Sequence, residues 1–105
     1  MSWISVPDYN EIKTKILKIY PKIPQLKTMP PKFKNEFFND VASLKKDMGE
    51  FCGKYAITND NGKDFYIWMS TLDSLLKNKT EIIDGKLDDD EIKRRIEKYR
   101  KSVLN

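Results

Sequence analysis

The stretch that decides the fold lies at residues 31–55 and reads PKFKNEFFNDVASLKKDMGEFCGKY. Its apolar residues recur every three or four positions, which is the spacing of one face of an α-helix. That face carries Phe33, Phe37, Val41, Leu44, Met48, Phe51 or Cys52, and Tyr55. At 1.5 Å per residue the predicted helix is roughly 37 Å long, which is enough to span a small helical domain.

A helix is also predicted before this stretch, starting after Asp8. Asp8 followed by Glu11 forms a capping box, the usual signature of a helix N-terminus. The apolar face that follows consists of Tyr9, Ile12, Ile16, Ile19, Ile23 and Leu26. Pro21 and Pro24 fall within this pattern, so the regular helix should either end near Tyr20 or kink there.

Two further helices are predicted after it. Residues 57–64, ITNDNGKD, are expected to form a turn because Asn61 and Gly62 tolerate positive φ angles. The third helix then carries Phe65, Trp68, Met69, Leu72, Leu75 and Leu76. Asp88 and Glu91 form a second capping box before the fourth helix, whose apolar face is Ile92, Ile96, Tyr99 and Val103.

These patterns predict an all-α fold, an up-down-up-down four-helix bundle that forms a single domain over residues 1–105. No alternating strand pattern interrupts them, and twelve aromatic residues supply material for a core. Gly49 and Gly53 lie four residues apart on the second helix and fit either a close helix crossing or a frayed helix end.

The composition argues against an enzyme, a metal site or a cofactor. Histidine is absent, which removes the commonest general base and metal ligand. Cys52 is the only cysteine and is expected to be a buried, inert thiol on the apolar face of its helix. The acidic run at residues 88–91 lacks the ligand spacing of a calcium loop and fits a helix start. With neither a signal-like start nor a membrane-spanning stretch, the sequence as given suggests a cytoplasmic protein.

The fourth helix concentrates positive charge and is the predicted partner-binding site. Between residues 92 and 105, Glu97 is the only acid, whereas the cations are Lys93, Arg94, Arg95, Lys98, Arg100 and Lys101. Such a surface can bind an acidic protein or, less readily at this charge density, nucleic acid. It can also simply complement the macrodipole at the end of a helix. Tyr99 is the one aromatic residue among these cations, and it is assigned to the core.

Several residues carry a resemblance to a known family. They are Tyr9, then Glu50, Phe51 and Tyr55, then Phe65, Leu72, Asp73, Ser74 and Leu75, and finally Leu87. In this pattern the chain resembles the small four-helix lumenal factors that assist assembly and repair of photosystem II. It departs from them at Ala56, where the family has Arg, and at residues 77–79, where the family has Gly-His-Tyr. The resemblance implies a location in the thylakoid lumen and docking to a photosystem II antenna subunit.

The sequence therefore predicts a non-enzymatic, protein-binding helical bundle. Its expected partner is a protein with an acidic surface, and the resemblance implies a photosystem II subunit. The alternative is a small helical protein that binds nucleic acid, or a phage or bacterial inhibitor that blocks such a surface.

Overall fold

The structure is a computed structural model that describes residues 9–54 and 59–104, with side chains for residues 9–52 and 64–102. Within these ranges every regular element is helical, which confirms the all-α prediction. Asp8, Tyr55 and Ala56 lie outside the described residues. Gly53 and Val103 lie in helices, but their side-chain environments are outside the described ranges.

The first helix ends where the prolines require. α1 spans Tyr9–Ile19 and continues as the 3-10 helix η1, Tyr20–Gln25, which contains Pro21 and Pro24. The prediction that the regular helix stops near Tyr20 is confirmed. Ile12, Ile16 and Ile19 are buried, and Leu26 is fully buried just after η1.

The second helix, α2, spans Pro31–Lys54, but its first predicted core residue was wrong. Phe33 is 52% exposed, whereas Phe38 is only 1% exposed. Of the two alternatives for the next core position, Phe51 is buried and Cys52 is exposed. The expectation of a buried thiol was therefore wrong. Gly49 is not at a close helix crossing, because a Cβ added there would meet nothing within 4 Å.

The third helix starts earlier than expected. α3 spans Asn59–Lys77, so residues 59–64 are helical instead of forming the predicted turn. Short polar residues such as asparagine are common at helix starts as well as in turns, so the local signal was ambiguous. Leu72 and Leu75 bury the inward face of α3 as predicted. Trp68 packs near Tyr9, with ring centroids 5.5 Å apart.

An additional short α-helix, α4, spans Lys79–Ile83, in the predicted connection between the third and fourth helices. The described part of the chain therefore has five α-helices instead of the predicted four. α4 ends in a Schellman motif, in which Lys86 N–H donates to the Glu81 carbonyl at 2.9 Å and Gly85 N–H to the Ile82 carbonyl at 3.1 Å. Gly85 has φ +74°, a conformation that glycine adopts without strain. This turn brings the chain back toward the start of the last helix.

α4 covers a face of α2 that the sequence pattern did not assign to the core. Lys34 is only 5% exposed, and its ammonium donates a hydrogen bond to the Ile82 carbonyl at 3.3 Å. The ammonium of Lys79 lies 6.0 Å from the centroid of the Phe38 ring. The position of α4 therefore explains why Phe38 is buried.

The last helix, α5, spans Asp89–Leu104 and begins at the predicted N-cap. Asp88 Oδ1 accepts a hydrogen bond from the Glu91 N–H at 2.8 Å. The capping box is incomplete, however, because the Glu91 carboxylate binds arginines of α5. Leu87 and Ile92 occupy the two positions of a hydrophobic staple, and both are buried.

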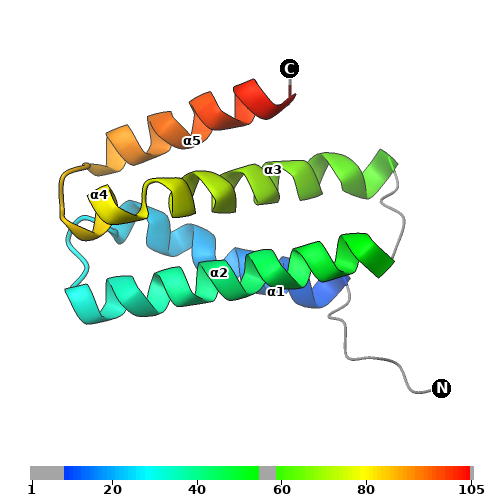
Figure 1. Ribbon diagram of the computed structural model, residues 1–105, viewed down its shortest axis with the longest axis horizontal. Coiled ribbons are helices and arrows are strands. Elements are labelled where there is room, and N and C mark those ends of the chain that lie inside the picture. The colour runs from blue at the N-terminus through cyan, green and yellow to red at the C-terminus, as the bar shows by residue number, and fades with distance from the viewer. Residues whose placement is uncertain (1–8, 55–58, 105) are drawn as a thin grey trace.

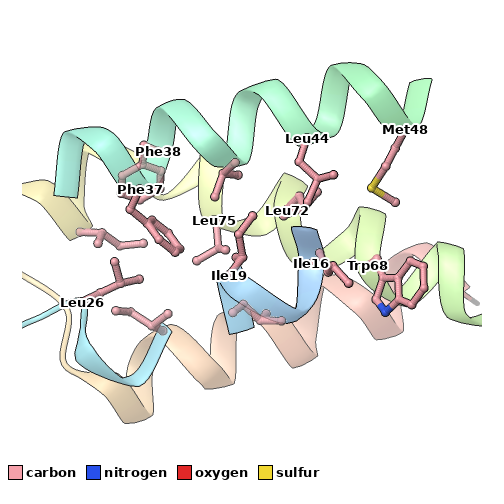
Figure 2. Packing of buried hydrophobic residues seen from close by; sticks show 14 of the residues in the cluster. Ile16, Ile19, Leu26, Phe37, Phe38, Leu44, Met48, Trp68, Leu72 and Leu75 are labelled. Atoms are coloured by element: carbon pink, nitrogen blue, oxygen red, sulfur yellow. The ribbon is translucent and has the colours of Figure 1, made fainter. Parts of the chain in front are cut away.

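The helices enclose one continuous hydrophobic core. α3 lies between α2 and α5, and α4 lies at the end of the molecule where α3 leads into α5 (Figure 1). Figure 2 shows side chains of α1, α2 and α3 meeting in the interior, with Ile16, Leu44 and Leu72 near its centre. α5 thus covers the core with one side and leaves the rest of its surface to solvent.

Candidate functional site

The six predicted partner-binding cations all lie on α5, and we call them the α5 basic surface: Lys93, Arg94, Arg95, Lys98, Arg100 and Lys101. Successive residues of an α-helix are about 100° apart, so the six are spread over the whole arc that α5 leaves outside the core. Lys93, Lys98 and Lys101 are exposed, and none of them has an ion pair with another described residue. These three lysines are the exposed charge of the surface that is not paired with a described acid.

Arg94 is exposed but already binds a carboxylate. Its Nε donates to Glu91 Oε2 at 2.8 Å, and its Nη2 donates to both oxygens of the same carboxylate. These hydrogen bonds are the main reason why the pKa of Glu91 lies below its ordinary value. The side chain of Arg94 is 76% exposed, so solvent weakens the pair and an external anion can reach the guanidinium.

Arg95 connects three parts of the fold. Its Nη1 donates to Asn78 Oδ1 at 2.8 Å and to Glu81 Oε2 at 3.2 Å, and its Nε donates to Glu91 Oε1 at 3.3 Å. The hydrogen bond to Glu81 is the largest contribution to raising the pKa of Arg95. Since Asn78 joins α3 to α4, Arg95 holds the α3–α4 junction against α5. We therefore regard it as a positioning residue.

Arg100 also interacts within the protein. It is half-buried on the side of α5 that faces α3, and its Nη2 donates to Thr71 Oγ1 at 3.2 Å. Its Nε is buried and has no hydrogen-bond partner among the described residues. Arg100 therefore contributes less to the open surface than its sequence position suggested.

An open groove lies beside these arginines, between the end of α3 and α5, and we call it the α3–α5 groove. Its volume is about 520 Å³. It is lined by four cations, one acid and four uncharged residues: Lys77, Arg94, Arg95, Lys98, Glu91, Ser74, Asn78, Tyr99 and Ser102. Three cations of the α5 basic surface therefore meet in one concave site, together with a fourth cation from α3.

Lys77 and Tyr99 are members of this site that the sequence interpretation missed. Tyr99 was assigned to the core, but it is half-buried and lines the groove. The ammonium of Lys77 lies 5.7 Å from the centroid of its ring, a cation–π contact. Lys77 ends α3, and nothing in the sequence indicates that this helix end meets the middle of α5.

Other kinds of site find little support in the described part of the chain. There, no three or more Cys, Asp or Glu side chains are grouped to hold a metal ion, and no helix has the length and apolar character needed to cross a membrane. Cys52 is exposed, but partial desolvation raises the pKa of its thiol, which lowers the fraction of reactive thiolate. The α5 basic surface and its groove remain the most developed candidate.

Comparison with known proteins adds no further assignment. No family model, curated protein or solved structure matches this chain.

Proposed function

We propose that this protein is a non-enzymatic binding module that docks an acidic surface of a partner protein on the α5 basic surface. The observation that carries the proposal is a set of exposed lysines next to the accessible guanidinium of Arg94. These lysines, Lys93, Lys98 and Lys101, form no ion pair with the residues whose side chains the structure describes. Charge complementarity of this kind speeds encounter and selects partners of opposite charge.

The proposal includes an architecture, an up-down-up-down four-helix bundle of α1, α2, α3 and α5 with α4 inserted before the last helix. In such a bundle each long helix buries one face and leaves the other to solvent. The outer face of α5 is then a rigid platform, because Ile92 and Ile96 anchor the helix in the core.

A protein partner is favoured over nucleic acid by the way the arginines are used. Bidentate recognition of phosphates and base edges relies mainly on arginine. Arg95 and Arg100 bind groups within the protein, and Arg94 binds Glu91. Most of the charge left open belongs to lysines, which act as point charges and suit a carboxylate-rich surface.

The resemblance to photosystem II assembly and repair factors narrows the proposal to one named partner, the lumenal side of an antenna subunit. Phe51, Phe65, Leu72 and Leu75, which carry much of the resemblance, are buried. Buried apolar residues mainly govern packing, so the resemblance supports a related bundle more directly than a shared docking surface. The lumenal segments of that subunit are therefore one arm of the test.

The test measures fluorescence anisotropy of a labelled decaglutamate peptide at low salt, alongside labelled lumenal antenna peptides and a decathymidylate oligonucleotide. The variant reverses three charges on α5, Lys93→Glu, Lys98→Glu and Lys101→Glu. The control reverses three exposed lysines elsewhere, Lys13→Glu, Lys27→Glu and Lys46→Glu, and so has the same net charge.

Exposed pairs contribute about 0.5 kcal/mol each, so the loss of three should make the α5 variant bind acidic peptide about tenfold more weakly than the control. Equal weakening in both variants would show that only net charge matters and would refute the docking site. Tighter binding of the oligonucleotide than of any peptide, with a steep salt dependence, would replace the protein partner by nucleic acid.

A further inference from the structure

The α3–α5 groove has an excess of positive charge that the surrounding structure does not balance. Four cations line it against a single acid, Glu91. Its volume of about 520 Å³ lies within the range of sites that hold small ligands or a few side chains. The rest of the α5 basic surface, by contrast, is the convex outer side of a helix. In the groove a partner's carboxylate could contact cations of two helices, α3 and α5.

Two lysines on opposite walls are available to such a carboxylate. Lys77 on α3 and Lys98 on α5 both line the groove, and neither has an ion pair with a described residue. The contact of Lys77 with the Tyr99 ring places its ammonium beside α5. A bound anion would therefore be approached from both helices.

A buried hydroxyl in the groove lining also lacks a partner. Ser74 is 1% exposed and lines the groove, and its Oγ makes no hydrogen bond within the described part of the protein. Buried hydroxyls in folded proteins nearly always have a partner. This second observation, independent of the charges, indicates that the site is suited to a polar ligand.

Glu91 already supplies a carboxylate at the rim of this groove. It binds Arg94 in an exposed, exchangeable pair and Arg95 in a partly buried one. If Arg94 turned to an external carboxylate, Glu91 would keep Arg95, and Arg95 would keep Asn78 and Glu81. The exchange would leave the network around Arg95 intact.

We infer that the α3–α5 groove binds an acidic segment of the partner protein between Lys77 and Lys98, and that Glu91 competes for Arg94 in the free protein. This inference rests on the proposed function and adds to it Lys77, which lies outside α5, and an internal competitor. The partner chemistry is a run of side-chain carboxylates, because the groove offers four cations from two helices against one acid.

The first experiment compares Glu91→Gln with Glu97→Gln, using the decaglutamate peptide. Both changes remove one negative charge from α5, but Glu97 is exposed and does not line the groove. Glu91→Gln should strengthen binding about threefold more than Glu97→Gln, because it also frees Arg94. Equal effects would overturn the role of Glu91 as a competitor.

The second experiment compares Lys77→Glu with Lys93→Glu, which lies on α5 but outside the groove lining. The change at Lys77 should weaken binding about threefold more than the change at Lys93. If Lys93→Glu is the more damaging, the groove is not the binding site. The proposed function then still stands provided that the triple α5 variant binds more weakly than its control, and falls if it does not.

The wild-type protein supplies a measurement that does not depend on the stability of any variant. Peptide titration followed by backbone amide NMR should shift the signals of Ser74, Lys77 and Tyr99 together with those of Lys98. Shifts confined to the outer positions Lys93, Glu97 and Lys101 would overturn the inference while agreeing with docking on α5.

Discussion

Replacing Phe38 by alanine should lower the free energy of unfolding by about 3–5 kcal/mol, whereas the same change at Phe33 should lower it by less than about 1 kcal/mol. Phe38 is 1% exposed and Phe33 is 52% exposed, although the helical pattern alone favours Phe33 as the core residue. Phe38 packs edge-on against Phe37, with ring centroids 5.3 Å apart, and lies beside Lys79 of α4. Truncation at Phe38 would leave a cavity beneath α4, whereas truncation at Phe33 would remove a side chain that is half in water.

Urea unfolding followed by circular dichroism gives both values, with the slope of the transition checking that the denatured states are comparable. A loss of 3–5 kcal/mol approaches the whole stability of a small domain, so Phe38→Leu and Phe33→Leu are measured in parallel, with the same order expected. Equal losses at the two positions, or a larger loss at Phe33, would show that α4 does not cover this face of α2. The explanation for the burial of Phe38 would then be refuted.

Three other predictions test local features. Gly49→Ala should stabilise the protein by up to about 1 kcal/mol, because a Cβ fits there freely. Gly85→Ala should destabilise it by about 1–2 kcal/mol, because Gly85 has a positive φ. Thermal unfolding measures both changes, and a change of the same sign at the two sites would contradict the reasoning. The pKa of Glu91 is lowered in the folded state, so its contribution to stability should be complete above about pH 4.3 and be lost as the pH falls through the lower folded value. Glu91→Gln should therefore lose less stability than the wild type on acidification. Parallel curves of unfolding free energy against pH for the two proteins would argue against this. Cys52 should react with iodoacetamide without denaturant, because it is exposed. The reaction near pH 8 should be slower than that of a free thiol, because the pKa of Cys52 is raised. Protection of Cys52 until the protein unfolds would instead support a buried thiol.

The long helices were predictable because each carries its own evidence. The spacing of Ile12, Ile16 and Ile19, and that of Val41, Leu44 and Met48, depends only on the geometry of a single helix. The end of α1 at Ile19 follows from two prolines, and the start of α5 follows from the side chain of Asp88. Local chemistry fixes features of this kind whatever packs against them.

α4 was missed because five residues are too few to show a helical period. The same omission hid the burial of Lys34 and Phe38, which both contact α4. Lys34 and Phe38 are four residues apart on α2, outside the apolar face that the sequence pattern defines, so they look like a solvent-facing pair. The buried ammonium of Lys34 donates a hydrogen bond to the carbonyl of Ile82, 48 residues further along the chain, and no local pattern contains that information.

For the candidate site, the sequence predicted where the cations lie but not which of them have partners. Sequence located the cations on α5, because a helix with a committed apolar face must display its other residues to solvent. It could not indicate which arginines already have partners. Arg95 meets Glu81 only because the Schellman turn at Gly85 reverses the chain between α4 and α5. The concentration of positive charge that first indicated a binding surface therefore includes an arginine whose contacts hold the fold together. In the groove, the cations without a described ion pair are Lys98 on α5 and Lys77 on α3.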